Sequence, residues 1–573
     1  MDTLSLIALA NAHYAGTAKT GTERATLRLV TNFTDMLLGK CLVGLSISQG
    51  ISPTLEDTPY RQYHFELADQ QSALMRSNAD ITYFIFDISP YAQTEFVADA
   101  THFETVISGI ETYAQNTKSS VVVMTFPLPY DTAYGNLFEL NPLWKQICTA
   151  NESLSRLAAK YANLSLIDSN RLISRIGRTH ARSPRDACAF DVPFTPEFTA
   201  TLAEECIAEL LSSRGRAKKC IVVDLDNTLW GGIVGEVGTQ GVALGSGYPG
   251  LAFQEFQRLL KRYRERGVIL AIASRNNEAD VDAVFAENTN MVLTKDDFAA
   301  VRVNWLPKSE NIRSLAKELN IGVDSMIFLD DDGANRAEVS NALPGIVVPE
   351  LPAEPERYGD MLITSTYFTQ RTLTAEDRTK ADMYTAERKR KEVTHGASPE
   401  QYLATLGIEI TISVNDEAQI PRLAQLTQKT NQFNLTTRRY TEADLKHMIL
   451  DGARIYAASV RDRFGSYGVT MLAIVTGAND TPVIDTLLMS CRVMGRSVEF
   501  TLLDRLATDA HKAGSSTLDA AFIKTAKNMP AEPFLRDAGF SAYGDTYRLD
   551  LERFAKAKPA AIARALEYIT IAP

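Results

Sequence analysis

Two carboxylates stand two positions apart near the middle of the 573-residue chain, directly after a short apolar run. The run Ile221–Val223 predicts a buried strand, and Asp224 and Asp226 follow its last residue. Like charges this close in a partly buried site are costly unless a cation neutralises them. Mg²⁺ favours a few carboxylates together with water and phosphate oxygens, so it is the ion that fits this pattern best. The spacing therefore predicts metal-assisted chemistry on a phosphate.

More polar groups follow downstream. Ser274 comes after the apolar run Val268–Ala273, Lys308 lies in a loop, and Asp330-Asp331 comes after Met326–Leu329. Because binding groups in parallel α/β sheets gather beyond the carboxyl ends of the strands, we expect these side chains to meet. One carboxylate would attack phosphorus, another would act as general acid and base, and the serine and lysine would hold phosphate oxygens. Two acids at one strand end are a weak signal, but four elements in this order favour a catalytic role over a structural one.

These residues resemble the four motifs of the HAD superfamily: Asp224-x-Asp226-x-Thr228, then Ser274, Lys308 and Asp330-Asp331. The resemblance implies that Asp224 is the nucleophile and Asp226 the general acid and base. It also implies an Mg²⁺ site with the ligands Asp224, Asp226, Asp330 and Asp331. Ser274 and Lys308 would be catalytic residues. Thr228, Arg275 and Asn276 would contact the substrate or its phosphate. Trp230–Gly232 would begin a flap too short to form a large cap, so we expect the site to be open to a bulky partner.

The elements around these motifs predict a multidomain α/β protein. In the first part, four apolar runs alternate with amphipathic stretches, which favours a three-layer α/β domain: Leu27–Thr31, Ile81–Ile88, Val121–Phe126 and Leu164–Ile167. The last part has longer strands typical of a mainly antiparallel α+β sheet: Ile408–Val414, Arg454–Val460, Val469–Val475, Val483–Ser490 and Thr517–Ile523. We expect domains at 1–215, 216–350 and 401–573. Between the second and third domains, residues 351–400 would form a linker that begins at Leu351 and a charged helical arm over Thr374–Glu392.

Beyond the HAD motifs, five longer stretches resemble the FkbH-like family. They are Asp224–Gly232 (DLDNTLWGG), Asn304–Lys308 (NWLPK), Thr430–Tyr440 (TNQFNLTTRRY), Arg461–Gly465 (RDRFG) and Asp485–Arg496 (DTLLMSCRVMGR). In that family a HAD domain with a minimal cap is fused to an SGNH-like (flavodoxin-like) N-terminal domain and a GNAT-like C-terminal domain. The resemblance implies that a small phosphorylated three-carbon substrate, 1,3-bisphosphoglycerate, supplies a glyceryl unit. An acyl carrier protein would receive that unit on its phosphopantetheine thiol, in polyketide-type biosynthesis.

Cys491 is the candidate thiol for this acyl transfer. It follows the predicted strand Val483–Ser490 and precedes a segment, Arg492–Ser497, that resembles the GNAT phosphate-binding loop. A helix N-terminus and a nearby arginine would lower the pKa of a thiol. The resemblance implies pantetheine contacts from Arg492, Gly495, Arg496, Ser497 and Asn528. The alternative is that Cys491 is simply a small buried apolar residue, which is the commonest fate of a free cysteine.

The chain departs from the family pattern at three places. Arg275 stands where the family has Lys, and Asp331–Arg336 (DDGANR) replaces Asp-Asn-Pro-x-Glu-Arg. Thr31–Thr34 stands where an SGNH hydrolase has Gly-Asp-Ser, and His180 is not part of an Asp-x-x-His pair. We therefore expect the N-terminal domain to be a non-hydrolytic scaffold or partner surface.

Composition narrows the classes of function. A net charge of −11 without a basic face disfavours nucleic-acid binding. No apolar stretch reaches 18 residues, so no membrane contact is expected. The six scattered cysteines without a CxxC pair, and a start without a signal peptide, favour the cytoplasm. Two alternatives stay open: a plain HAD phosphatase with a partner-binding C-terminal domain, and a GNAT-type acyltransferase acting on a sugar amine. The acyl unit could also be lactyl or another group.

Overall fold

The computed structural model describes residues 2–88, 101–129, 133–371, 383–384, 403–404, 406–463, 465–477, 481–525, 528–544 and 546–572. Apart from residues 383–384, the predicted charged arm Thr374–Glu392 lies outside these residues. The chain divides into two compact units, residues 1–214 with 369–372 and residues 215–368 with 373–573. The first unit holds one sheet and the second holds two. Within the described residues, no helix combines the length and apolar character needed to cross a membrane.

The first sheet is wholly parallel, with strand order β2-β1-β3-β4-β5. Its strands are β1 (Glu23–Thr31), β2 (Ile51–Asp57), β3 (Ile81–Ile85), β4 (Ser120–Met124) and β5 (Leu164–Ile167). This is the flavodoxin-like order of a doubly wound sheet, and the α/β class expected for this domain is confirmed. β2 was not among the four predicted strands. Alternate strand residues face two separate apolar clusters, because successive side chains of a strand point to opposite faces.

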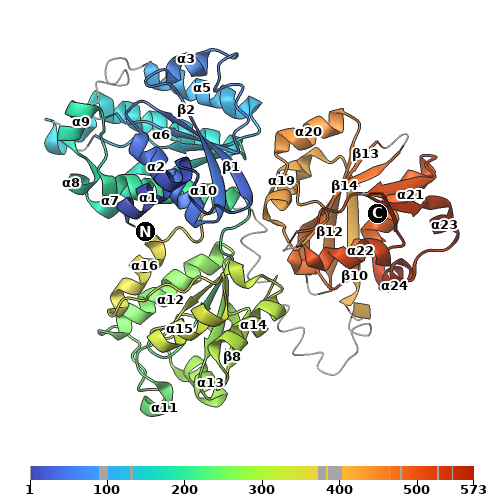
Figure 1. Cartoon of the computed structure of the whole chain (residues 1–573). Coiled ribbons are helices and arrows are strands. Elements are labelled where there is room, and N and C mark those ends of the chain that lie inside the picture. The colour runs from blue at the N-terminus through green and yellow to red at the C-terminus, as the bar shows by residue number, and fades with distance from the viewer. Residues whose placement is uncertain are drawn as a thin grey trace. The chain divides into compact units, whose positions relative to one another are not determined.

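Helices cover both faces of this first sheet, which is drawn in blue to teal in Figure 1. They are α1 (Thr3–Tyr14), α2 (Met36–Ser48), α3 (Tyr63–Ala68), α5 (His102–Asn116), α6 (Pro142–Lys160), α7 (Ser169–Ile176), α8 (Arg178–Ala181), α9 (Pro184–Phe190) and α10 (Pro196–Ser213), with the 3-10 helix η2 (Gly135–Leu140). Local sequence starts the long ones. Asn141 caps α6 and Thr195 caps α10, each followed by a proline in the first turn.

The second sheet, in green and yellow in Figure 1, is also wholly parallel, with order β8-β7-β6-β9. Its strands are β6 (Cys220–Val223), β7 (Ile269–Ser274), β8 (Ala300–Val303) and β9 (Met326–Leu329). The helices are α11 (Val234–Val237), α12 (Gly250–Glu265), α13 (Glu278–Glu287), α14 (Lys308–Leu319), α15 (Gly333–Ala342) and α16 (Tyr358–Thr364), with the 3-10 helices η3 (Lys295–Asp297), η4 (Val323–Ser325) and η5 (Pro355–Arg357).

The stretch expected to begin a linker instead completes the core of this second sheet. Leu351, Tyr358, Leu362 and Phe368 are buried in the apolar cluster that contains Ile221. These side chains cover one face of the sheet, so residues 351–368 pack as part of this fold and do not connect two domains.

The third sheet is mixed and mainly antiparallel, in orange and red in Figure 1, with order β16-β17-β15-β14-β13-β12-β10-β18. Its strands are β10 (Ile408–Val414), β12 (Arg454–Asp462), β13 (Gly465–Thr476), β14 (Val483–Met489), β15 (Thr517–Ala520), β16 (Ser541–Tyr543), β17 (Thr546–Asp550) and β18 (Ile569–Ala572), and β11 (Phe433–Asn434) pairs with β14. The helices are α19 (Ile420–Lys429), α20 (Glu442–Leu450), α21 (Val498–Lys512), α22 (Glu532–Asp537), α23 (Leu551–Lys556) and α24 (Ala560–Tyr568), with η6 (Glu417–Gln419), η7 (Cys491–Val493) and η8 (Met529–Ala531). The predicted α+β character is confirmed.

Two parallel strands of this third sheet diverge, and a short segment lies between them. β14 pairs with β15 only through Val483 and Ile484. Farther along β14, β11 takes the hydrogen bonds, with Phe433 opposite Met489. Leu435 then joins the two sides, because its N–H donates to Leu487 O (3.0 Å) and its carbonyl accepts from Ile523 N (2.8 Å).

Candidate functional site

Three carboxylates meet at the carboxyl end of the second sheet. Asp224 follows β6, and Asp330 and Asp331 follow β9, whose residue Leu329 lies opposite Val223 in the parallel ladder. Each of the three acids offers one oxygen, and these oxygens all lie within 4.8 Å of one another. The strand register therefore brings together acids that are more than a hundred positions apart in the sequence.

Lys308, the first residue of α14, places its ammonium group among these acids. Its Nζ lies 2.5 Å from Asp224 Oδ1 and 3.1 Å from Asp330 Oδ2, and it donates a hydrogen bond to Ala273 O at 2.8 Å. The Lys308 side chain is 1% exposed. One ammonium cannot neutralise three carboxylates, and among the described residues the buried Asp224 Oδ1 and Asp330 Oδ2 have no polar partner other than Lys308. The donor set fits a hard divalent cation such as Mg²⁺.

Burial and the crowding of like charges raise the pKa values of the acid pair. Burial, and then the neighbouring Asp224 carboxylate, raise the pKa of Asp330. Burial, followed by the charges of Asp330 and Asp224, raises the pKa of Asp331 to about 6. Desolvation and like charges both disfavour the ionised form, and the positive charge of a bound cation would oppose them.

Asp226 is not part of this carboxylate group, which corrects its prediction as a side-chain metal ligand. Its Oδ1 accepts hydrogen bonds from the Trp230 indole Nε1 (2.9 Å) and the Val234 N–H (3.1 Å). Its Oδ2 accepts from the Asn276 side chain (2.9 Å). These donors hold the carboxylate toward the flap and the β7 loop, so it stays available for proton transfer.

The loop after β6 is fixed by its own polar groups. Asn227 has a left-handed φ of 53°, and its side chain accepts a hydrogen bond from Gly232 N (2.8 Å). Thr228, expected to contact phosphate, accepts from Asp331 N (3.2 Å) and donates to Asp331 Oδ1 (3.4 Å). The Tyr358 hydroxyl also donates to Asn227 O (3.1 Å). The turn is thus attached both to the acid pair and to α16.

The residues after β7 lie around the same centre. Ser274 ends the strand and is buried, and its Oγ accepts a hydrogen bond from Asn276 Nδ2 (3.4 Å). Arg275 is exposed and donates to Asn335 Oδ1 (3.2 Å) and Leu306 O (3.5 Å). The sequence did not single out Asn335 for a role. Its position five residues after Asp330 in the first turn of a helix is the signal that could have indicated one.

In the third sheet the predicted acyl-transfer residues gather after β14. Cys491 opens the 3-10 helix η7, and its side chain lies outside what the structure describes. Gly495 and Ser497 both have left-handed φ angles, 78° and 61°, and no side chain caps α21. The loop Arg492–Ser497 therefore leads into a helix whose first N–H groups could bind an anion.

Two predicted pantetheine contacts have internal partners instead. Arg496 is buried, its NH1 lies 3.3 Å from Asp462 Oδ2, and its guanidinium stacks 4.4 Å from the Tyr467 ring centroid. Asn528 is fully buried and donates to Asn434 O and Ile523 O, both at 2.9 Å. These contacts fix β11 and the loop after β14, and they do not present either side chain to a ligand.

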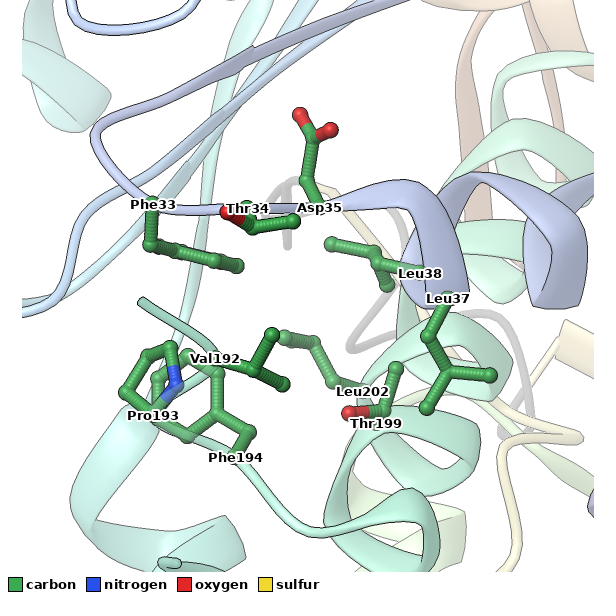
Figure 2. A pocket seen from close by; sticks show the side chains of 10 residues that line it. All are labelled: Phe33, Thr34, Asp35, Leu37, Leu38, Val192, Pro193, Phe194, Thr199 and Leu202. Carbon is green, nitrogen blue, oxygen red and sulfur yellow. The ribbon is translucent and has the colours of Figure 1, made fainter. Parts of the chain in front are cut away.

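Among the described residues, a small hollow lies beyond the carboxyl end of β1 in the first sheet. Figure 2 shows a hollow between Phe33, Val192 and Leu202, with the carboxylate of Asp35 pointing away from it. The hollow encloses about 10 Å³, roughly room for one water. Thr31, the first residue of the stretch that stands in place of Gly-Asp-Ser, donates to Asp35 Oδ2 at 2.8 Å.

Comparisons with protein-family models and with curated proteins find no match. Among solved structures, the chain is similar to the N-terminal part of the protein BF1531 from Bacteroides fragilis, which contains a phosphatase domain and was crystallised with Mg. The identity is 26% and the TM-score 0.60, over 65% of this chain and all of that one. Two acetyltransferase-type structures match about a quarter of the chain: YncA from Salmonella typhimurium with acetyl-CoA (16% identity, TM-score 0.20, 98% of that chain) and the N-acetyltransferase SpeG from Vibrio cholerae (11% identity, TM-score 0.21, 96% of that chain).

Proposed function

We propose that the chain is an Mg²⁺-dependent phosphatase joined to an acyltransferase, which takes 1,3-bisphosphoglycerate and loads a glyceryl unit onto an acyl carrier protein. The observation that carries the phosphatase half is the ammonium of Lys308 between Asp224 and Asp330 at the carboxyl end of a parallel sheet. The likeness to the phosphatase-containing part of BF1531 supports it. The glyceryl unit and the carrier protein are proposed from the FkbH-like motifs.

The phosphatase chemistry follows from the placement of the two aspartates. A carboxylate oxygen of Asp224 attacks phosphorus, the bond from phosphorus to the substrate oxygen breaks, and Asp226 gives its proton to that oxygen. Water then attacks the aspartyl-phosphate and gives a proton to Asp226, which releases inorganic phosphate and restores Asp224. Lys308 and Ser274 hold the phosphate oxygens. Mg²⁺ held by Asp224, Asp330 and Asp331 would neutralise charge on the transferred group.

The acyl step is assigned to Cys491. Its thiolate attacks the acyl carbon of the acyl phosphate, the bond from that carbon to the phosphate oxygen breaks, and phosphate leaves. The phosphatase centre removes the phosphate that is still attached to the three-carbon unit. The thiolate of the phosphopantetheine arm then attacks the thioester, and the Cys491 thiolate is released and takes up a proton. The loop Arg492–Ser497 at the start of α21 would receive the phosphate of the arm.

Intact-mass spectrometry tests this proposal. The full chain is incubated with Mg²⁺, 1,3-bisphosphoglycerate and carrier protein in its holo or apo form. A glyceryl mass gain on the holo carrier alone supports the proposal. The Cys491→Ala variant should give neither that product nor a covalent acyl adduct on the enzyme, and an adduct that persists in the variant would remove Cys491 from the mechanism.

A second candidate is a phosphatase whose third sheet only binds a partner. β11 occupies the gap between the diverging strands β14 and β15, and Asn528 is satisfied inside the protein. The backbone groups at this end of β14 are therefore already hydrogen-bonded to β11 and are not available to an extended ligand. Phosphate release without any mass gain on the holo carrier would favour this candidate. The amine-modifying alternative would require a product that forms only with an amine and acyl-CoA.

A further inference from the structure

Arg275 is exposed beside the carboxylate site, and no acid in the described part of the chain forms an ion pair with it. Its Nε and NH1 donate only to neutral oxygens, Leu306 O and Asn335 Oδ1. In a chain with a net charge of −11, an exposed guanidinium held by neutral acceptors is available to an anion.

Asn335 holds this arginine in place and leaves its positive charge unneutralised. Its side chain accepts from Arg275 and donates through Nδ2 to Asp330 Oδ1 (3.3 Å), so one amide links the guanidinium to the carboxylate site. A neutral amide can make this bridge without neutralising the arginine. An acid of similar length at this position would form an ion pair with Arg275 and remove its attraction for a ligand.

Two of the positions at which the chain departs from the FkbH-like pattern, 275 and 335, contact each other. The pattern has Lys and Glu there, an oppositely charged pair, whereas this chain has Arg and Asn. The exchange at these two positions adds one positive charge, and Asp332, which stands where the pattern has Asn, adds one negative charge.

Arg336, the next residue along α15, adds a second guanidinium without a carboxylate partner in the described part of the chain. Its NH1 donates to two backbone oxygens, Asp330 O (2.8 Å) and Asp331 O (2.6 Å). These bonds hold the turn that carries the acid pair, and its charge adds to that of Arg275. Arg275, through Asn335, and Arg336 are therefore both hydrogen-bonded to the segment that carries the acid pair.

We infer that Arg275 binds a second anionic group of the substrate and not the phosphate that Asp224 attacks. In the proposed mechanism Lys308 and Ser274 hold the reacting phosphate, whereas the Asn335 side chain lies between Arg275 and Asp330. The substrate class is then a short phosphorylated compound that carries a carboxylate or a second phosphate a few bonds from the first. The inference deepens the proposed phosphatase function and depends on it for the place of the reacting phosphate.

Isothermal titration of the full chain with two probes tests this inference. With Mg²⁺ present, 3-phosphoglycerate and glycerol 3-phosphate differ in a carboxylate that only the first carries. A charge-assisted hydrogen bond should make the wild type bind 3-phosphoglycerate about tenfold more tightly or better. Arg275→Met removes the cation, and Asn335→Glu neutralises it in place. Both variants should bring the ratio of the two dissociation constants close to one. Arg275→Lys should keep part of the preference for 3-phosphoglycerate.

The matched control is Asn341→Glu, the same change on an exposed position near the end of α15. It should keep the wild-type ratio. A wild-type ratio close to one, or a ratio that survives in both Arg275→Met and Asn335→Glu, would overturn the inference. If the wild type binds 3-phosphoglycerate with the expected preference but releases no phosphate, the proposed phosphatase function fails. The binding role of Arg275 then stands.

Discussion

Asp224 and Asp226 are two positions apart in the sequence but lie in different surroundings. Asp224 faces the Lys308 ammonium and the acid pair, which fits its proposed role as the nucleophile. Asp226 is held by the Trp230 indole and the Asn276 amide, outside that group. In the proposed mechanism, these neighbours separate the nucleophile from the proton carrier.

Replacing Asp224 by Asn tests the role of the nucleophile. The amide oxygen carries no negative charge and attacks phosphorus poorly, so phosphate release should fall by about a thousandfold or more. Release is followed with a phosphate-detecting assay in the presence of Mg²⁺, and circular dichroism checks that the variant is folded. An Asp224→Asn variant with activity within tenfold of the wild type would assign the nucleophile elsewhere.

Glu499, in the first turn of α21, should make stability depend on pH. Its Oε2 is buried without a hydrogen-bond partner among the described residues, and burial raises the pKa of Glu499 from 4.5 to about 7. Between these values the folded state keeps a proton that the unfolded state has lost. Stability should therefore fall as pH rises from about 4.5 to 7, by an amount on the order of 2–3 kcal/mol.

Scanning calorimetry of the wild type and Glu499→Gln measures this effect. The two should melt alike near pH 4.5, and the glutamine variant should melt at the higher temperature at pH 8. The exposed Glu552→Gln serves as the control and should follow the wild type at both pH values. Equal melting temperatures of wild type and Glu499→Gln at pH 8 would show that this carboxyl is solvated.

At the scale of elements, helix α14 shows how packing places the side chain of Lys308, for which a catalytic role is proposed. The helix begins at Lys308 after Pro307, which has no side-chain group to cap it. Glu338 of α15 provides the cap, because its carboxylate accepts from Ser309 Oγ (2.5 Å) and Ser309 N (3.2 Å). The helix that follows the acid pair thus holds the first turn of the helix that carries the lysine.

Glu338→Ala should therefore loosen Lys308 as well as cost about 1 kcal/mol of capping energy. Mass spectrometry after reductive methylation should show Lys308 protected in the wild type and modified in this variant, and the kcat for phosphate release should fall about tenfold. Glu338→Gln can keep both contacts and should stay close to the wild type. Asp168→Ala removes a cap with two hydrogen bonds from α7 and should leave Lys308 protected. If Lys308 stays protected in Glu338→Ala, the cap has no part in positioning it.

The sequence predicted the elements whose residue types act locally. Apolar runs such as Met326–Leu329 and Ile408–Val414 are strands with the expected bounds, and the acids that follow β6 and β9 form the site. Short strands escaped prediction, because β8 has four residues, two of them polar or small, and β11 has two; only their neighbours make them strands. The partners of Asp226 and Arg496 also depend on tertiary contacts, such as the pairing of Arg496 with Asp462. Spacing alone could not show them.

At the scale of the whole molecule, the chain returns to its first unit after completing the second sheet. Residues 369–372 belong to the first unit. There the buried Arg371 guanidinium donates to Ser120 Oγ (2.6 Å) and Asn163 O, and its Nε lies 3.8 Å from Glu209 Oε2. The expected domain 1–215 is therefore completed by a segment from much later in the sequence.

Arg371→Met should destabilise the first unit because it leaves Glu209 buried without its cation. Breaking a buried pair on one side costs about 3–5 kcal/mol. Scanning calorimetry of the full chain should show one transition moved to lower temperature, and the double variant Arg371→Met with Glu209→Gln should recover part of the loss. A single variant that melts like the wild type would mean that residues 369–372 do not support this unit.

We expect Asp224, Asp330 and Asp331 to share one divalent ion, which calorimetric titration with Mg²⁺ can measure. The wild type should bind one Mg²⁺ at this site, and Asp330→Asn should weaken binding by at least about tenfold because one ligand charge is lost. Asp226→Asn changes a carboxylate outside the group and should keep the affinity within a fewfold of the wild type. A wild type that takes up no Mg²⁺, or an Asp330→Asn variant that binds it as tightly as the wild type does, would rule out a shared ion at these three residues.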